Sequence, residues 1–349
     1  MSKIYLQDYA PKAQVCLHET QIDAPKFPVI DAHTHLSQEF GGGWCDRPVP
    51  ELVEVLDRAH VMKLVDLDGG WGEHILNHRL EKFKAQAPDR FIFFGGVDFA
   101  AWEKHGNAFG EWAAKRLEAQ VRRGAEGLKI WKQLGLNIRD AQGDRVPVDD
   151  PRLDPIWATA GALNIPVLVH VADPVAFFEP IDAANERFEE LHAHPDWHFP
   201  SPPYPSFMTI MHQLARLIAR HPDTRFIGAH VGCYAENLAW VGDLLDRCPN
   251  FYIDFSARIA ELGRQPYSAR DFFIKHQDRI LFGTDTPASL AMYRLHYRFL
   301  ETRDEYFPYA LVTPPPQGRW RVYGLYLPDA VLEKVYHRNA QRVLNISID

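Results

Sequence analysis

The segment Val-Ile-Asp-Ala-His-Thr-His-Leu, residues 29–36, is the first of eight short apolar runs that end in polar or turn-forming residues. Each run is rich in Val, Ile and Phe, which predicts a β-strand; the runs are residues 29–36, 64–70, 91–99, 125–131, 165–173, 225–232, 251–257 and 280–287. Between most of them, apolar residues recur at every third or fourth position, which predicts helices, for example over residues 50–63, 109–123 and 207–221. Strands and helices therefore alternate along the chain, and this alternation predicts a parallel sheet.

Eight strand–helix repeats within roughly 260 residues match the number and length of a (β/α)8 barrel. A doubly wound open sheet is the alternative, but no G-x-G-x-x-G follows the first strand. We therefore predict an α/β fold: a single-domain TIM barrel over residues 29–349, after an N-terminal arm at 1–28. Residues 174–205 follow the fifth strand and are long enough to form a lid-like loop over the site. After the Pro-containing stretch 301–328, residues 329–344 are predicted to form a closing helix.

Composition limits the partners and the cellular location. Among 349 residues, 46 acidic and 38 basic side chains give a net charge of -8, which disfavours binding to nucleic acid or to an anionic membrane surface. Because the chain has no signal-peptide pattern and no run of 18 apolar residues, we expect a cytoplasmic protein without a membrane partner. The cysteines are scattered, so a bound metal would be held by carboxylates and by some of the 17 histidines.

Metal-binding residue types follow four of the predicted strands. His33 and His35 end the first strand, and residues two apart on a strand share a face. His170, His230 and Asp285 close the fifth, sixth and eighth apolar runs. Since the carboxyl ends of barrel strands meet at one mouth, these side chains can surround one site. Imidazoles with a carboxylate favour zinc first, with manganese, iron or cobalt as alternatives.

The chain resembles the amidohydrolase superfamily, and within it the amidohydrolase-related branch that includes aminocarboxymuconate semialdehyde decarboxylase-like enzymes, resorcylate decarboxylases and hydrolases of lactones and amides. The resemblance covers residues 29 to about 344. It rests on the set Asp31-Ala-His33-Thr-His35, His170, His230, Gly283-Thr-Asp285 and the closing Arg338-Asn339-Ala340-Gln-Arg342-Val-Leu.

The resemblance implies that His33, His35, His170 and Asp285 bind one divalent metal ion, with His230 beside the bound water. Asp285 or His230 would then move the proton. The resemblance also implies a small-molecule substrate and is compatible with a homodimer, since barrels of this family often form one.

Lys129, on the fourth predicted strand, leaves the number of metal ions open. In many superfamily members a carboxylated lysine at this place bridges two ions, and His230 would complete such a site. An uncarboxylated Lys129 could instead bind a substrate anion as a point charge. One ion is our expectation and two ions are the alternative.

Several other residues have less specific interpretations. We expect Asp31 to share the inward face of His33 but to be structural, and Asp254 is ambiguous. His192 and His194 repeat the two-apart spacing near His198, but they lie in a polar stretch that predicts a solvated loop rather than a metal site. For the remaining histidines, which fall on predicted helices or loops, a surface or capping role is the default expectation.

Substrate contacts are predicted near the strand ends. Trp44, Trp71 and Trp131 follow or end strands and could line the mouth of the barrel. Arg258 and Lys132 could bind a carboxylate or another anion.

The predicted function is hydrolysis of an ester, lactone or amide of a small anionic substrate through a metal-activated water. The alternative is a metal-dependent non-oxidative decarboxylase of an aromatic or muconate-type acid, which would use the same ligands. A metal-free barrel that only binds or scaffolds is a third possibility, and the complete set of ligands argues against it.

Overall fold

The computed structural model describes residues 3–5, 8–9 and 11–347 and confirms the predicted barrel. Eight parallel strands lie in the order β1 to β8, and each strand is hydrogen-bonded to the next along the chain. Backbone hydrogen bonds from Ala32 N to Phe282 O (2.9 Å) and from Asp285 N to His33 O (2.8 Å) bring the end of the sheet back to its beginning. The strands are β1 Val29–Thr34, β2 Val61–Asp66, β3 Phe91–Gly95, β4 Gly127–Ile130, β5 Val167–Val169, β6 Phe226–Gly228, β7 Phe251–Asp254 and β8 Ile280–Leu281.

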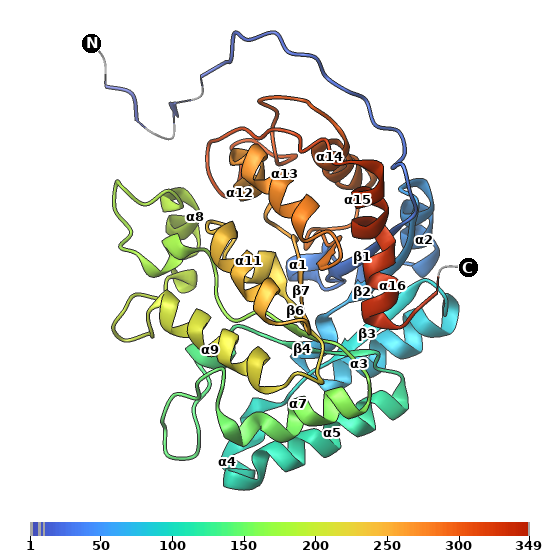
Figure 1. Cartoon of the computed structure of the whole chain (residues 1–349), viewed down its shortest axis with the longest axis vertical. Helices are drawn as coiled ribbons and strands as arrows, with labels where there is room; N and C mark the ends of the chain where they lie inside the picture. Colours follow the sequence, from blue (N-terminus) through green and yellow to red (C-terminus); the bar gives the residue numbers. More distant parts are fainter. Residues whose placement is uncertain (1–2, 6–7, 10, 348–349) are drawn as a thin grey trace.

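Helices surround the strands (Figure 1). The longer ones are α2 Val49–Arg58, α3 Glu73–Arg79, α5 Phe109–Arg123, α7 Asp154–Ala162, α9 Phe207–Arg220, α11 Leu238–Arg247, α13 Pro266–Lys275 and α14 Leu290–Glu301. The shorter ones are α1 Gln38–Gly41, α4 Trp102–His105, α6 Gln133–Leu136, α8 Phe188–Ala193, α10 Ala229–Gly232, α12 Ile259–Arg264, α15 Asp329–Glu333 and α16 Asn339–Leu344.

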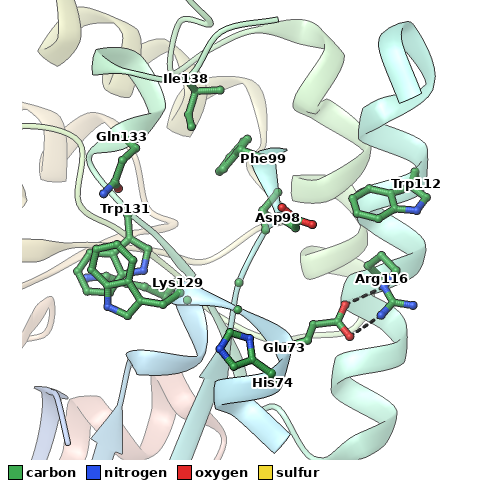
Figure 2. Close-up of a pocket in the computed structure, with 15 residues that line it drawn as sticks. Glu73, His74, Asp98, Phe99, Trp112, Arg116, Lys129, Trp131, Gln133 and Ile138 are labelled. Atoms are coloured by element: carbon green, nitrogen blue, oxygen red, sulfur yellow. Dashed lines mark hydrogen bonds and ion pairs between the residues drawn. The ribbon is translucent and has the colours of Figure 1, made fainter. Parts of the chain in front are cut away.

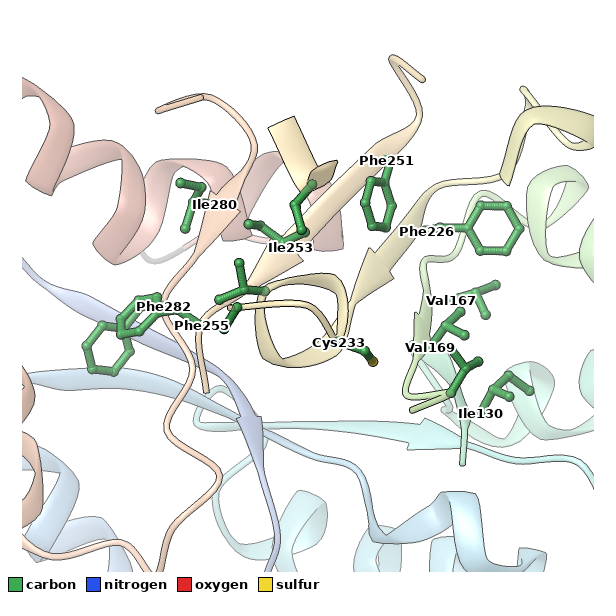
Figure 3. Packing of buried hydrophobic residues seen from close by; sticks show 14 of the residues in the cluster. Ile130, Val167, Val169, Phe226, Cys233, Phe251, Ile253, Phe255, Ile280 and Phe282 are labelled. Carbon is green, nitrogen blue, oxygen red and sulfur yellow. The ribbon is translucent and has the colours of Figure 1, made fainter. Parts of the chain in front are cut away.

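Alternation along the strands separates two layers of apolar residues. In β5, Val167 and Val169 pack in the large cluster between strands and helices, whereas Leu168 belongs to a second, smaller cluster. Phe226 and Ile227 of β6 divide in the same way. Successive side chains of a strand point to opposite faces, so the smaller cluster lies inside the barrel. Figure 3 shows side chains of the larger cluster that lie on β5, β6 and β7.

The boundaries of several elements differ from the predictions. The second strand begins at Val61 rather than at residue 64, and the runs at 225–232 and 280–287 are strand only over Phe226–Gly228 and Ile280–Leu281. The helix predicted over residues 50–63 ends as α2 at Arg58, because His60 adopts a left-handed conformation (φ 57°) and β2 already begins at Val61. The helix predicted over 329–344 is present, but α15 and α16 are separated by a π-helical turn, Lys334–Arg338.

The segment 174–205 is not an irregular loop throughout. It contains the 3-10 turns Val175–Phe178 and Pro195–Trp197 and the helix α8 between them. An ion pair between Arg187 and Glu261 joins it to α12. This ion pair holds the segment against the residues that follow β7.

Residues 11–22 form neither helix nor strand and run along the outside of the molecule (Figure 1). Thr20 binds Asp304 through its backbone N (2.8 Å), and Lys26 binds Asp329 (2.7 Å). Within the described residues, no helix has the length and apolar character that crossing a membrane requires.

Candidate metal centre

Three imidazoles meet the carboxylate of Asp285 at the carboxyl end of the barrel. The Nε2 atoms of His33 and His35 lie 3.8 Å and 3.3 Å from Asp285 Oδ1, and Nε2 of His230 lies 3.7 Å from Asp285 Oδ2. His33, His35 and Asp285 form a group whose ligand atoms are all within 4.8 Å of one another. The structure therefore brings together four of the predicted site residues.

The opposite nitrogen of each ring has its own hydrogen-bond partner. Nδ1 of His33 lies 2.9 Å from Asp254 Oδ2, and Nδ1 of His35 lies 2.8 Å from Asp68 Oδ1. Nδ1 of His230 lies 2.9 Å from the carbonyl oxygen of Ser256. An oxygen acceptor at Nδ1 keeps the proton there and leaves the Nε2 lone pair free, which is the tautomer that a metal ligand needs.

Burial favours the neutral form of His33 and His230, which is the form that binds metal. Desolvation lowers the pKa of His33, although the nearby Asp254 carboxylate opposes the shift. Desolvation also holds the pKa of His230 well below its usual value, and the charge of Arg258 adds to the effect. Burial acts to raise the pKa of Asp254, but the contacts with His33 and Ser256 outweigh it and lower that pKa. Neutral imidazoles beside ionised carboxylates are the protonation states required for binding a cation.

His170 lies beside this group but is turned away from it. Its ring centroid is 4.5 Å from that of His230, whereas its Nε2 faces Asp173 Oδ1 at 3.4 Å. Asp173 in turn forms an ion pair with Lys132. Burial lowers the pKa of His170 to about 4, so the ring is neutral. His170 is thus near the site, but its Nε2 is not among the three convergent donors.

Lys129, on β4, is buried, and within the described residues its Nζ has no hydrogen-bond partner. Desolvation lowers its pKa to about 8, and the carboxylates of Asp285 and Asp254 oppose that shift. A buried amine without a partner is costly unless another group binds it. Lys129 therefore remains a candidate for carboxylation or for contact with an anion.

Two ligand candidates lie on strained backbone. His230 and Asp285 have positive φ angles of 58° and 50°, and Ala257, before Arg258, has a φ of 53°. Such conformations cost energy for residues other than glycine and cluster at functional sites. The turns after β6 and β8 aim these side chains at the barrel axis instead of continuing the strands.

A cavity of about 420 Å3 opens onto the imidazoles and Asp285, whose side chain is 20% exposed. Both Arg258 and Lys132, for which the sequence suggested anion binding, line this cavity. Lys132 is paired with Asp173, but Arg258 donates only to the carbonyl of Ala257, and no carboxylate in the described part of the chain pairs with it. The segment 174–205 supplies much of the remaining wall: Pro174, Phe177, Arg187, Glu190, Asp196, Trp197 and Phe199.

Two of the three predicted tryptophans lie near the metal centre. Trp131 stacks on His35 with ring centroids 5.2 Å apart, and Trp71 stacks on Trp131 at 3.9 Å. Both line a second, larger cavity of about 620 Å3 on the β2–β4 side (Figure 2). Trp44 is not brought there: it is buried and its indole N–H donates to the carbonyl of Ala288 (3.3 Å).

The other histidines divide into exposed and buried ones. His192 is exposed on helix α8, not in the predicted loop, and His194 lies just beyond that helix, stacked on Trp197. The expectation that the remaining histidines lie at the surface or cap helices is wrong for His296 and His337, which are buried within α14 and the π-helical turn Lys334–Arg338. His276 is also buried, but it is the C-cap residue of α13.

Asp31 does not share the inward face of His33. It accepts hydrogen bonds from Thr284 Oγ1 (2.7 Å) and from the hydroxyl of Tyr293 on α14 (3.0 Å). The pairing of β1 with β2 shifts register between Asp31 and Thr34, which changes the alternation of side chains at this point.

Sequence reasoning missed two of the groups that orient the rings, Asp68 and Ser256. Asp68 also accepts from the backbone N of Leu36 (3.0 Å) and from Arg79 (3.1 Å). The available signal was position: Asp68 follows β2, and Ser256 follows β7 by two residues, at the same end of the barrel as the ligands.

Comparisons with known proteins agree with this fold. A family model described as "Amidohydrolase" matches residues 30–346. A 2,6-dihydroxybenzoate decarboxylase from Rhizobium has 17% identity and a TM-score of 0.57, covering 93% of this chain and 99% of that chain. No curated protein matches the chain.

Two further solved structures are similar. A dihydroxybenzoic acid decarboxylase from Polaromonas, with bound manganese and 2-nitroresorcinol, has 17% identity and a TM-score of 0.55, covering 91% of this chain and 97% of that chain. A protein from Acinetobacter baumannii, described as a probable 2-pyrone-4,6-dicarboxylic acid hydrolase with citric acid bound, has 12% identity and a TM-score of 0.51, covering 92% and 100%. At these identities the likeness is one of fold.

Proposed function

The chain belongs to the amidohydrolase family, and from that premise we propose that it is a metal-dependent hydrolase of an ester, lactone or amide of a small carboxylic acid. The observation that carries the proposal is the convergence of three imidazole Nε2 atoms on the partly exposed carboxylate of Asp285. The rest of the proposal assigns a role to each of these residues.

The donor set fits a divalent metal ion. His33, His35 and Asp285 offer two neutral imidazoles and a carboxylate, a combination that suits zinc, with manganese, iron or cobalt as alternatives. We assign His170 as a further ligand, which requires its Nε2 to leave Asp173. A bound divalent ion supplies a Lewis acid that polarises a carbonyl and increases the acidity of water. We propose one ion, and two only if Lys129 is carboxylated.

Asp285 is the group we assign to proton transfer. Its side chain is 20% exposed in the cavity, whereas that of His230 is only 2% exposed. Asp285 can therefore accept a proton from a water molecule in the cavity and return it to the leaving group. Nδ1 of His230 bonds the carbonyl of Ser256, so its Nε2 is an acceptor that helps to position the same water.

Arg258 is the residue we assign to substrate binding. Its guanidinium lines the cavity without a carboxylate partner among the described residues, and it is only 6% exposed. A guanidinium binds a carboxylate with two parallel hydrogen bonds. Arg258 would thus hold an anionic group of the substrate while the reacting carbonyl lies near Asp285.

Decarboxylation of an aromatic acid is the second candidate. Trp71, Phe177 and Trp197 line the same cavity as Arg258, and aromatic walls with one cation fit an aryl carboxylate. Solved structures of similar fold include dihydroxybenzoate decarboxylases. In this reaction Asp285 would donate a proton to carbon rather than accept one from water.

One screen separates the two reactions. The purified protein, loaded separately with zinc and with manganese, is incubated with carboxylate-bearing esters, lactones and amides and with dihydroxybenzoates. Hydrolysis is measured as incorporation of labelled oxygen from water, and decarboxylation as released carbon dioxide. We expect oxygen incorporation that Asp285→Asn abolishes. Carbon dioxide release without oxygen incorporation would establish the second candidate and overturn the first.

A further inference from the structure

The larger cavity adjoins the metal centre but is separate from the cavity that opens onto Asp285. It has a volume of about 620 Å3 and shares Trp71 and Gln133 with the smaller cavity. Lys129 of β4 also lines it. Because the two cavities meet at shared side chains, a substrate that reacts at Asp285 could extend into the larger one.

The walls of this cavity are flat aromatic faces held by their neighbours. Trp71 stacks on Trp131 with centroids 3.9 Å apart and an interplanar angle of 26°. Phe99 stacks on Phe109 at 5.8 Å, and Trp112 contributes a third indole (Figure 2). Rings fixed in this way present a preformed surface for stacking, with little ordering needed on binding.

The charged side chains that line this cavity balance in sign, Glu73 and Asp98 against Arg116 and Lys129. Glu73 accepts from Arg116 Nε (2.7 Å), as Figure 2 shows, and also from Arg123 Nη2 (2.6 Å). The carboxylates that act most strongly on Lys129 are Asp285 and Asp254, both in the metal centre. In contrast to the cavity with Arg258, this one therefore favours an uncharged group.

Two polar atoms of its lining residues are buried without a partner among the described residues. These are the donor Nε1 of Trp131 and the acceptor Oε1 of Gln133. An unsatisfied buried donor or acceptor is energetically costly, and a ligand that pairs with it removes that cost. If the side chains of Trp131 and Gln133 turn toward the cavity, a hydroxyl or amide on the edge of a ring can accept from the first atom and donate to the second.

We propose that the larger cavity is an aromatic subsite, which binds a flat, uncharged ring carrying a hydroxyl or amide group. The substrate would then be an acid whose carboxylate binds Arg258 and whose aromatic group enters this subsite. The statement about the substrate rests on the proposed function, whereas binding of the ring does not.

Calorimetry with two probes tests the subsite directly. The probes are 4-hydroxybenzamide and 4-hydroxycyclohexanecarboxamide, which carry the same polar groups on a flat and on a puckered ring. We expect the flat probe to bind wild-type protein about three- to tenfold more tightly, since one stacked aromatic pair adds about 0.5–1.5 kcal/mol. The Trp71→Ala variant should lose this preference for the flat probe. The Gln133→Leu variant should bind both probes more weakly than wild type.

Trp240→Ala is the matched control, because Trp240 lies on α11 against Tyr234 and lines neither cavity. It should bind both probes as wild type does. If Trp71→Ala does not fold, Phe99→Leu replaces it, with the same expected loss. Equal binding of the two probes by wild type would overturn the subsite, as would an unchanged preference in the Trp71 variant.

The subsite and the reaction can fail separately. If the flat probe binds as expected while no ester, lactone or amide is hydrolysed, the hydrolase proposal is wrong and the subsite stands. If hydrolysis occurs while both probes bind equally, the subsite is wrong and the hydrolase proposal stands.

Discussion

Replacing Asp254 by Asn should reverse the hydrogen bond that orients His33. Asp254 Oδ1 accepts from the backbone N of His230 (3.0 Å) and from N and Oγ of Ser256 (3.1 and 2.6 Å), while Oδ2 faces Nδ1 of His33 at 2.9 Å. In Asp254→Asn, the side-chain amide oxygen must take the place of Oδ1, because the three groups that face this position are all hydrogen-bond donors. The NH2 group therefore faces His33 and donates to Nδ1.

This reversal moves the ring proton of His33 to Nε2, the atom that faces Asp285 across 3.8 Å. A protonated Nε2 has no lone pair for a metal ion, so binding must first restore the other tautomer against the new hydrogen bond. Loss of such an orienting partner costs about 10- to 100-fold in metal affinity. We therefore expect zinc binding to weaken by about 1.4–2.7 kcal/mol.

The assay is a zinc titration of metal-stripped protein in competition with a fluorescent indicator. Asp150→Asn is the control, because Asp150 is also a buried carboxylate, but its partner is Arg152 and it lines neither cavity. It should retain wild-type zinc affinity. If folded Asp254→Asn binds zinc within about twofold of wild type, the tautomer of His33 does not govern metal binding and the reasoning fails.

Three further predictions concern other parts of the chain. The variants His33→Ala and Asp285→Asn should each lose bound metal, measured by elemental analysis, and enzymatic activity together. The double variant His192→Ala with His194→Ala should keep its metal. Loss of metal in the double variant would contradict the assignment of the ligands. Arg258→Met should weaken inhibition by small carboxylates by at least about tenfold and leave metal content unchanged; equal inhibition would remove Arg258 from the anion site. Burial lowers the pKa of His296 to about 4 from a usual 6.5, so the unfolded chain binds the extra proton first and stability falls as the pH drops through this interval. In urea unfolding, the free energy of unfolding of the wild type should fall by about 2 kcal/mol more than that of His296→Phe between pH 7 and pH 5. An equal fall in the variant would show that His296 is not the source of the pH dependence.

The barrel could be predicted because its signal repeats along the chain. Eight apolar runs of strand length each had a counterpart in the structure, and the errors were at boundaries, as at His60, whose positive φ ends α2 early. A positive φ is uncommon for residues other than glycine, so the histidine itself gives no indication that the helix ends there. Convergence of His33, His35, His230 and Asp285 follows from strand order, because all carboxyl ends of a parallel barrel meet at one mouth.

Ring orientation could not be predicted in the same way. The position of His170 after β5 indicates that it lies at the mouth, but the direction of its Nε2 depends on Asp173, which is paired with Lys132. Burial of His276 and His296 likewise depends on packing between helices that the sequence places only by periodicity. Trp44 shows the same limit, since a tryptophan after a strand can face the mouth or fill the core.

The candidate metal centre lies at the seam where the barrel closes, and this explains why its geometry depends on residues outside the proposed ligand set. The backbone N of Asp285 donates to the carbonyl of His33 (2.8 Å), so closure itself sets the distance between these two ligands. Asp31 fixes the same seam by accepting from N and Oγ1 of Thr284 (3.1 and 2.7 Å), the residue before Asp285. Because this contact is fully buried, a change at Asp31 would be transmitted to the ligands as a shift of β8 against β1.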